Sequence, residues 1–397
     1  MHVRSTATLA AVVALAAVGV ATGSSAPAAA AAPAPLFVAT TGNDSNTGDL
    51  THPLRSIQRA VDLAQAGTVI SVRGGTYGLT TNLQITRSGT AGQPITLTRY
   101  GTERVIIDGE ALPNTPAPVG GSIPRAQRGT VHMAASYWRL IGLELVNGPY
   151  GLYCDGCNGN VFERLSTHDN YESGLQIQGA SSGNLVLNLD SYLNRDPRKN
   201  GESADGLAIK EGSGTGNVVR GARLWNNVDD GFDAWMFTSP ITVEGSVAYG
   251  NGVNRWNFPD FAGDGNGFKM GGGDPDPAAD HVIRNSIAFS NIAHGFTDNG
   301  NPGSITFDHD TAYANPKTGF DVDSGTSRLT ANLSVRNGTA VALGSSTGSG
   351  NSWNLSSVPA LASTDSSVLT GPRTATGAIA SSTFLRPANG ADLGARI

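Results

Sequence analysis

Four of the aspartates and one of the lysines in three short, glycine-containing stretches of the sequence could act together. They are Asp205 in SADGLAIKEG, Asp229, Asp230 and Asp233 in VDDGFDAWMF, and Lys269 in GDGNGFKMGG. Carboxylates that are brought together repel one another unless they are protonated or share a cation. Oxygen ligands without histidine or cysteine favour a hard cation, and Ca²⁺ accepts about six to eight such oxygens. If the fold gathers the three stretches, the four aspartates are predicted to bind Ca²⁺.

Lys269 is the candidate base of this site. A bound cation nearby disfavours the ammonium form and lowers the pKa of the lysine below its ordinary value of about 10.4. A neutral amine beside a cation suits removal of a proton next to a carboxylate, followed by loss of the group one carbon further on. This β-elimination cleaves polymers of uronic acids. A simpler interpretation stays open, in which the aspartates cap turns and the lysine is solvated or forms an ion pair worth less than about 1 kcal/mol.

The elements that must position these residues are indicated by a repeat of glycine followed by a large apolar residue. The pair recurs at Gly151-Leu152, Gly174-Leu175, Gly206-Leu207, Gly231-Phe232, Gly267-Phe268, Gly295-Phe296 and Gly319-Phe320. Successive glycines are 23 to 36 residues apart. The shortest spacings fit one coil of a β-solenoid, and the longer ones fit a coil with an inserted loop.

The segments between the repeat glycines alternate apolar and polar residues, as in NLVLNLDSYLN and HVIRNSIAFSN. Alternation with a period of two is typical of strands. An asparagine four residues before the glycine, where stacked side chains can form a hydrogen-bonded ladder, recurs at Asn170, Asn227, Asn291 and Asn315. A β-sandwich would show hairpin turns and a propeller would show longer repeats. The sequence therefore predicts an all-β fold, a right-handed parallel β-helix.

The register of such a solenoid decides whether the acids meet. Equivalent positions on adjacent coils lie about 4.8 Å apart, the spacing of paired strands. The residue after each glycine is large and apolar, so it points into the core, and the next residue points outward. The outward column contains Asp233 and Lys269, and the residue before the glycine is Asp205 or Asp230. The repeat therefore gathers the four aspartates on two neighbouring coils, with Lys269 on a third.

Three regions are expected along the chain. Residues 1–32 have a basic start, an apolar run and small residues, which predicts a cleaved secretory signal peptide, with a membrane anchor as the alternative. Residues 36–344 are expected to form the β-helix, and a short helix from Leu54 to Ala66 is expected to cap its first coil. Residues 345–397 are rich in small and hydroxyl residues, and we expect an irregular arm that packs along the outside.

Charge and cysteine content restrict the possible partners. The formal net charge is −6 without a basic stripe, which argues against nucleic acid as a partner, and no apolar run beyond the N-terminus suggests a membrane span. The only two cysteines, Cys154 and Cys157, lack a second pair that would complete a zinc site, so a structural disulfide or two unreactive thiols are expected. We expect a secreted, extracellular monomer.

The three stretches resemble polysaccharide lyase family 9, which comprises calcium-dependent pectate lyases and exopolygalacturonate lyases built on a right-handed parallel β-helix. The matching segments are ADG at 204–206, NVDDGFD at 227–233 and GNGFK at 265–269. The resemblance implies that the four aspartates are Ca²⁺ ligands, that Lys269 is the base, and that the substrate is an acidic polysaccharide, pectate or polygalacturonate. Lys210, and Arg255 in the insert before Asn266, are candidates for binding substrate carboxylates.

Three other hypotheses use the same residues. A hydrolase of the polygalacturonase type also has clustered aspartates on a β-helix, but its Gly-His-Gly and Arg-x-Lys motifs do not follow the paired aspartates here. A lyase of another uronate, such as alginate or rhamnogalacturonan, would keep both the acids and the lysine. A calcium-stabilised carbohydrate-binding solenoid would keep the acids, because metal can join coils, but would not need Lys269.

Overall fold

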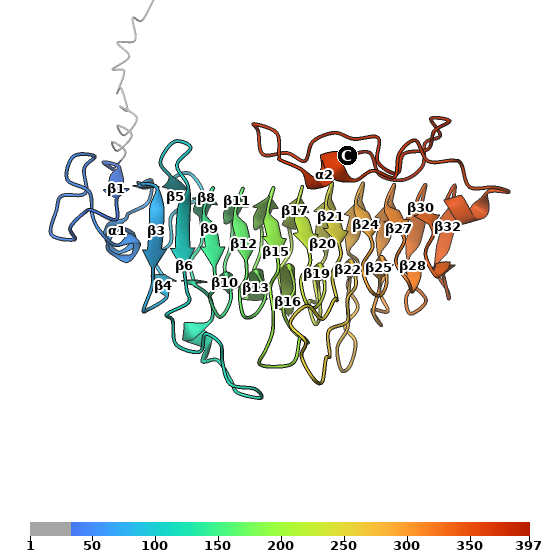
Figure 1. Cartoon of the computed structure of the whole chain (residues 1–397), viewed down its shortest axis with the longest axis horizontal. Coiled ribbons are helices and arrows are strands. Elements are labelled where there is room, and N and C mark those ends of the chain that lie inside the picture. The colour runs from blue at the N-terminus through green and yellow to red at the C-terminus, as the bar shows by residue number, and fades with distance from the viewer. Residues whose placement is uncertain (1–32) are drawn as a thin grey trace, which may run out of the picture. The chain divides into compact units, whose positions relative to one another are not determined.

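The structure is a computed structural model that describes residues 33–397. The predicted signal peptide, residues 1–32, lies outside the described residues. Within the described part, the chain runs through successive coils that build three parallel sheets (Figure 1). This arrangement confirms the predicted all-β solenoid. Among residues 33–397, no helix has the length and apolar character needed to cross a bilayer.

Each sheet takes one strand from successive coils, and all the strand pairs within the three sheets are parallel. Sheet A comprises β1 (Leu36–Val38), β2 (Val69–Val72), β5 (Ile95–Arg99), β8 (Trp138–Ile141), β11 (Val161–Glu163), β14 (Leu185–Leu187), β17 (Asn217–Arg220), β20 (Ile241–Glu244), β23 (Val282–Arg284), β26 (Thr306–Asp308), β29 (Arg328–Thr330) and β32 (Thr347–Ser349). Sheet B comprises β3 (Gly75–Gly78), β6 (Val105–Asp108), β9 (Glu144–Val146), β12 (Ser166–His168), β15 (Asp190–Tyr192), β18 (Arg223–Trp225), β21 (Val247–Tyr249), β24 (Ile287–Phe289), β27 (Thr311–Tyr313) and β30 (Leu333–Val335). Sheet C, which carries the repeat glycines, comprises β4 (Leu83–Ile85), β7 (Val131–Met133), β10 (Leu152–Asp155), β13 (Leu175–Ala180), β16 (Leu207–Ser213), β19 (Phe232–Asp233), β22 (Phe268–Lys269), β25 (Phe296–Thr297), β28 (Thr318–Asp321) and β31 (Thr339–Ala342).

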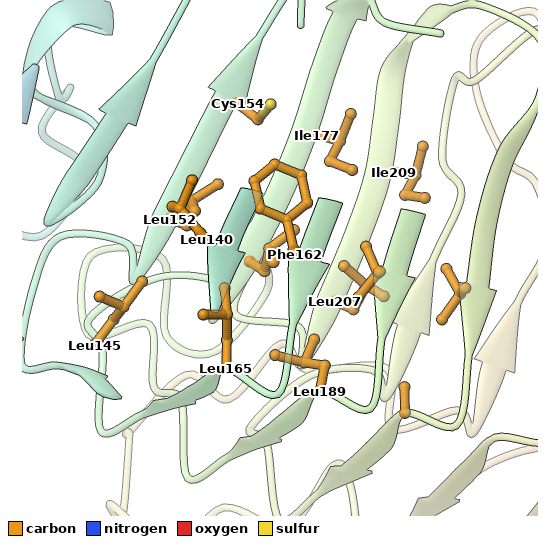
Figure 2. Close-up of a cluster of buried hydrophobic side chains, with 14 of the residues drawn as sticks. Leu140, Leu145, Leu152, Cys154, Phe162, Leu165, Ile177, Leu189, Leu207 and Ile209 are labelled. Carbon is orange, nitrogen blue, oxygen red and sulfur yellow. The ribbon is translucent and has the colours of Figure 1, made fainter. Parts of the chain in front are cut away.

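The apolar residues that follow the repeat glycines form a column inside the coils, as the register predicts. Strand pairing aligns Leu152, Leu175, Leu207, Phe232, Phe268, Phe296 and Phe320, all fully buried. Figure 2 shows Leu152 and Leu207 of this column near Cys154, Ile177 and Ile209 of the next one. Each such side chain contributes about 1.5–3 kcal/mol of burial free energy, so the stacked columns stabilise the solenoid along its length.

An asparagine ladder runs beside this column and explains the repeat glycines. From the second member on, each ladder asparagine accepts a hydrogen bond from the main-chain N–H of the member before it, in the order Asn170, Asn194, Asn227, Asn251, Asn291, Asn315 and Asn337. A Cβ on Gly206 would lie 2.7 Å from the Asn227 amide nitrogen, and a Cβ on Gly231 would lie 2.6 Å from the Gly267 carbonyl oxygen. The glycines are therefore required by the close approach of the ladder and the next coil.

The capping helix is shorter than the sequence pattern predicted. Helix α1 spans Ile57–Leu63, because the Ser56 hydroxyl caps its start by accepting from the Arg59 N–H, and because the backbone turns extended at Ala64. The buried side chains of Ile57, Ala60 and Val61 join the core.

The solenoid continues past Gly344, where the sequence placed its end. Strand β32 pairs in parallel with β29, so the last rung of sheet A lies within the segment predicted as the arm. A 3₁₀ turn, η2 (Ser352–Asn354), follows it. Beyond that turn the chain doubles back outside sheet B, where α2 (Ser367–Thr370) is its only α-helix within the described residues (Figure 1). Leu369, Ile379 and Phe384 of this segment pack with Phe289 and Tyr313 of sheet B.

Candidate functional site

The register brings the predicted acids and lysine together on sheet C. Asp233 on β19 is the direct strand partner of Lys269 on β22. Asp205, Asp229 and Asp230 lie in the turns that lead into β16 and β19, and each offers one carboxylate oxygen within 4.8 Å of the others. The sequence frame therefore placed all five side chains correctly beside one another.

All four carboxylates are buried, and this burial is the main influence on their charge. Burial, opposed by the nearby lysines, raises the pKa of Asp205 to about 6 and that of Asp230 to about 7. Burial together with the adjacent Asp230 raises the pKa of Asp229 well above its usual range. For Asp233 the effect of burial is outweighed by Lys210 and Lys269, so its pKa is lowered.

Two of these carboxylate oxygens have no hydrogen-bond donor. Asp205 Oδ1 and Asp230 Oδ2 are buried and accept no hydrogen bond within residues 33–397, although the Lys269 ammonium lies 3.3 Å from Asp230 Oδ2 as an ion-pair partner. A buried acceptor without a partner is costly, and several such oxygens facing one another are the donor set of a hard cation. The cluster of Asp205, Asp229 and Asp230 therefore fits a Ca²⁺ ion by both its chemistry and its unsatisfied atoms.

Lys269 is held by two acids at the edge of the cluster. Its Nζ lies 2.7 Å from Asp264 Oδ2, to which it donates, and 3.3 Å from Asp230 Oδ2. Burial alone would lower the pKa of Lys269, but the carboxylates led by Asp230 and Asp233 raise it well above its usual value. Asp264 is half exposed and was not predicted from the sequence, because it lies in an inserted loop outside the repeat frame.

Lys210 reaches the cluster through an irregularity in β16. Between Ile209 and Gly212 two residues stand opposite the single Gln178 of β13, and Glu211 adopts a left-handed conformation with φ 52°. Such a bulge re-aims the side chains beside it. Lys210 Nζ donates to Asp205 Oδ2 at 2.8 Å and to Asp233 Oδ2 at 3.0 Å.

The structure does not bring Arg255 to this site. Its guanidinium donates to the Asn226 side chain and to the Gly250 carbonyl oxygen, so it stabilises the turn after β21. Arg255 is absent from the lining of the cavity described next. The sequence placed it correctly in an insert beside the site, but the direction of a loop side chain depends on its local hydrogen bonds.

A cavity of about 570 Å³ opens beside Lys210, Asp233 and Lys269. Its walls come from coils and inserted loops on both sides, and they include residues that the sequence did not single out, namely Arg128, Tyr150, Gln176, Arg198, Lys199, Glu202, Ser203, Glu211, Trp235, Ala262 and Asp264. A second hollow of about 270 Å³ shares Asp264 and continues toward later coils, where its lining is acidic at Asp298, Asp321 and Asp323. Acids, amines and an exposed tryptophan together suit a polar polymeric ligand.

A parallel β-helix with a buried acidic cluster and a lysine at a polar cavity defines a solenoid protein with an enzyme-like site on one sheet. The chain belongs to the Pel9A-like family of right-handed β-helix proteins, because a model of that family matches residues 36–338. This match also agrees with the predicted handedness of the solenoid.

Relatives and solved structures agree with this assignment. Pectate lyase PEL9 of Emericella nidulans is 50% identical over 91% of this chain and 94% of its own length. The crystal structure of pectate lyase Pel9A superimposes with a TM-score of 0.78 at 29% identity, covering 91% of this chain and 90% of that one. A rhamnogalacturonan lyase structure gives a TM-score of 0.76 at 25% identity and covers 91% of this chain and 99% of that one.

Proposed function

We propose that the protein is a polysaccharide lyase, a calcium-dependent pectate lyase that cleaves 4-linked galacturonan by β-elimination. The observation that carries this proposal is the position of Lys269, a buried amine in direct contact with a cluster of buried carboxylates at a polar cavity. The similarity to Pectate lyase PEL9 over nearly the whole chain supports pectate as the substrate class.

Asp205, Asp229, Asp230 and Asp233 would hold the Ca²⁺ ion. When bound, the ion would neutralise the substrate carboxylate and stabilise the negative charge that develops next to it. The buried oxygens of Asp205 and Asp230 that accept no hydrogen bond within residues 33–397 support this assignment.

Lys269 would remove the proton from C5 of the sugar. The C5–H electron pair forms the new C4–C5 double bond as the 4-linked oxygen leaves and takes a proton from solvent, so the products are a shortened chain and an unsaturated uronate, and no water is added across the bond. The proton on Lys269 Nζ can pass to Asp264, whose Oδ2 accepts from Nζ at 2.7 Å and whose side chain reaches solvent. Because the surrounding acids are what keep Lys269 charged, neutralising them leaves burial to favour the free amine.

Lys210 would hold the acid cluster together and then contact a substrate carboxylate, since it lines the cavity as well as pairing with Asp205 and Asp233. Acting on a plant polymer outside the cell, the enzyme would be secreted, with residues 1–32 as the signal peptide. We propose that it works as a monomer.

The test is incubation of the protein with polygalacturonate, with and without a calcium chelator. We expect ultraviolet absorbance from the conjugated double bond, and we expect the chelator to abolish it. New reducing ends without this absorbance would indicate a hydrolase, and binding without cleavage would indicate a carbohydrate-binding solenoid.

Another uronate polymer is the second candidate substrate, because a rhamnogalacturonan lyase shares the fold over 91% of this chain. Initial rates on polygalacturonate, rhamnogalacturonan and alginate, compared at equal uronate concentration, distinguish these substrates.

A further inference from the structure

We propose that Arg128 and Arg198 form a carboxylate-binding subsite in the wall of the cavity, that the buried Glu172 positions Arg198, and that this subsite selects uronates with a free carboxylate. The inference rests on the proposed function, because it describes how the same site would recognise an acidic polysaccharide. Neither arginine belongs to the repeat frame or contacts the acid cluster.

Arg198 is fixed at both its backbone and its side chain. Its carbonyl oxygen accepts from the Gly120 N–H at 2.9 Å, and its Nη1 donates to the Gly121 carbonyl oxygen at 3.1 Å. Its Nε donates to Glu172 Oε1 at 2.5 Å. These contacts join two loops from different coils, so the guanidinium is held in one orientation at the cavity.

Glu172 is suited to positioning the arginine rather than to binding substrate. It is fully buried, and Arg198 is the cation with which it forms its ion pair. A buried carboxylate is stable only when a cation or donors satisfy it. Glu172 therefore fixes the orientation of the Arg198 guanidinium through this ion pair.

Hydrogen bonds inside the loop that carries Arg198 also order it. Asp196 is buried, and its carboxylate accepts from the backbone N–H of Lys199 and of Ser203, each at 3.0 Å. This carboxylate fixes the two ends of the segment that contains Arg198. The insert that lengthens the repeat between Gly174 and Gly206 is thus an ordered segment that forms part of the cavity wall.

Arg128 is held separately on the neighbouring loop. Its Nε donates to the Ile123 carbonyl oxygen at 3.3 Å, and its Nη1 donates to the Tyr153 hydroxyl at 3.1 Å. The guanidinium also lies 5.5 Å from the centre of the Tyr153 ring. No carboxylate among residues 33–397 forms a salt bridge with Arg128.

The two guanidinium groups keep donors available for a ligand. Within residues 33–397, no acceptor takes a hydrogen bond from Nη2 of Arg128 or Nη2 of Arg198. Arginine binds carboxylates through parallel N–H donors, and these charge-assisted bonds are strong. A methyl ester cannot accept them as a charged group does. The subsite therefore favours free uronate over esterified uronate.

The test compares Arg198→Gln with the wild type on polygalacturonate and on highly methyl-esterified pectin. We expect KM on polygalacturonate to rise about 10- to 100-fold, the effect of losing hydrogen bonds to a charged group, while kcat stays within about threefold. KM on the esterified polymer should change little. Arg125→Gln is the control, since Arg125 lies in the loop that carries Arg128 but pairs with Asp155 and does not line the cavity; its kinetics should equal those of the wild type.

A double-mutant cycle tests the positioning role of Glu172. Glu172→Gln should raise KM without lowering kcat, and adding Glu172→Gln to Arg198→Gln should have no further effect, whereas Arg198→Lys should restore part of the affinity. Additive effects of the two substitutions, or an equal change in KM on both polymers, would overturn the proposal.

Calorimetric binding of a short galacturonate oligomer separates this inference from the proposed function, because it needs no turnover. If the wild type binds the oligomer but cleaves nothing, the proposed function fails. The subsite is then supported if Arg198→Gln binds the oligomer more weakly than the wild type, and overturned if the two affinities are equal. If the wild type cleaves pectate and Arg198→Gln binds and cleaves as well as it does, only the subsite is wrong.

Discussion

Replacing Lys210 with methionine should destabilise the metal-free protein and strengthen its binding of Ca²⁺. Lys210 Nζ lies 2.8 Å from Asp205 Oδ2 and 3.0 Å from Asp233 Oδ2, and both carboxylates are buried. Removing one partner of a buried ion pair leaves an uncompensated charge and costs about 3–5 kcal/mol. The methionine keeps most of the apolar volume, so the change isolates the charge.

The loss of stability caused by Lys210→Met should depend on pH and on Ca²⁺. At about 2 °C per kcal/mol for a large domain, the melting temperature in chelator should fall by about 6–10 °C. The fall should be smaller at pH 5 than at pH 8, because a carboxylate with a pKa already raised to about 6 is then largely protonated. In saturating Ca²⁺ the difference should nearly vanish, because the ion replaces the missing positive charge.

Differential scanning calorimetry at both pH values, with chelator and with Ca²⁺, measures these shifts, and calorimetric titration measures the Ca²⁺ affinity. Arg139→Met is the control, since Arg139 forms an exposed ion pair at 3.5 Å with Glu163 and should shift the melting temperature by less than about 2 °C. An equal loss of stability with and without Ca²⁺, or weaker Ca²⁺ binding by Lys210→Met, would refute the reasoning.

Two further predictions concern the solenoid itself. Burial lowers the pKa of His281 from 6.5 to about 4, and its Nδ1 accepts from the Ile241 N–H, so the stability it contributes is present above pH 6.5 and is lost as the pH falls toward 4. His281→Asn keeps a hydrogen-bond acceptor but does not titrate in this range. In denaturant unfolding, the free energy of unfolding should fall between pH 7 and pH 4 by about 3 kcal/mol less in this variant than in the wild type. Parallel curves of the free energy of unfolding against pH would contradict this. Gly231→Ala places a Cβ 2.6 Å from the Gly267 carbonyl oxygen, so it should lower the melting temperature by several degrees. Its control is Gly245→Ala, where a Cβ meets open space and φ is 56°, so the substitution should cost only about 1 kcal/mol of backbone strain. Equal melting temperatures for the two variants would argue against crowding at the ladder.

The sequence predicted the solenoid and the central cluster because both depend on one repeating frame. Once Gly206, Gly231 and Gly267 are aligned, parallel pairing forces Asp233 beside Lys269, and no loop geometry is needed. The same frame found four members of the asparagine ladder. It missed Asn194 and Asn251, because inserted loops separate them from the next repeat glycine, and Asn337, because no glycine follows it four residues later.

The walls of the cavity were not predictable in this way. Arg198 and Asp264 lie in inserts, where the direction of a side chain is set by contacts with distant loops, such as the one between Arg198 and Gly121. Arg255 lies in a similar insert and turns to Asn226 instead. The bulge that turns Lys210 toward the acids also left no signal in the alternation pattern.

The most direct test of the central claim is the turnover of Lys269→Gln on polygalacturonate in saturating Ca²⁺, measured beside its Ca²⁺ affinity. If Lys269 is the base, kcat should fall by about 10²–10⁴-fold, the usual contribution of a general base, while the fold is retained and Ca²⁺ still binds. Turnover within about tenfold of the wild type, in a variant that folds and binds Ca²⁺ normally, would contradict the account.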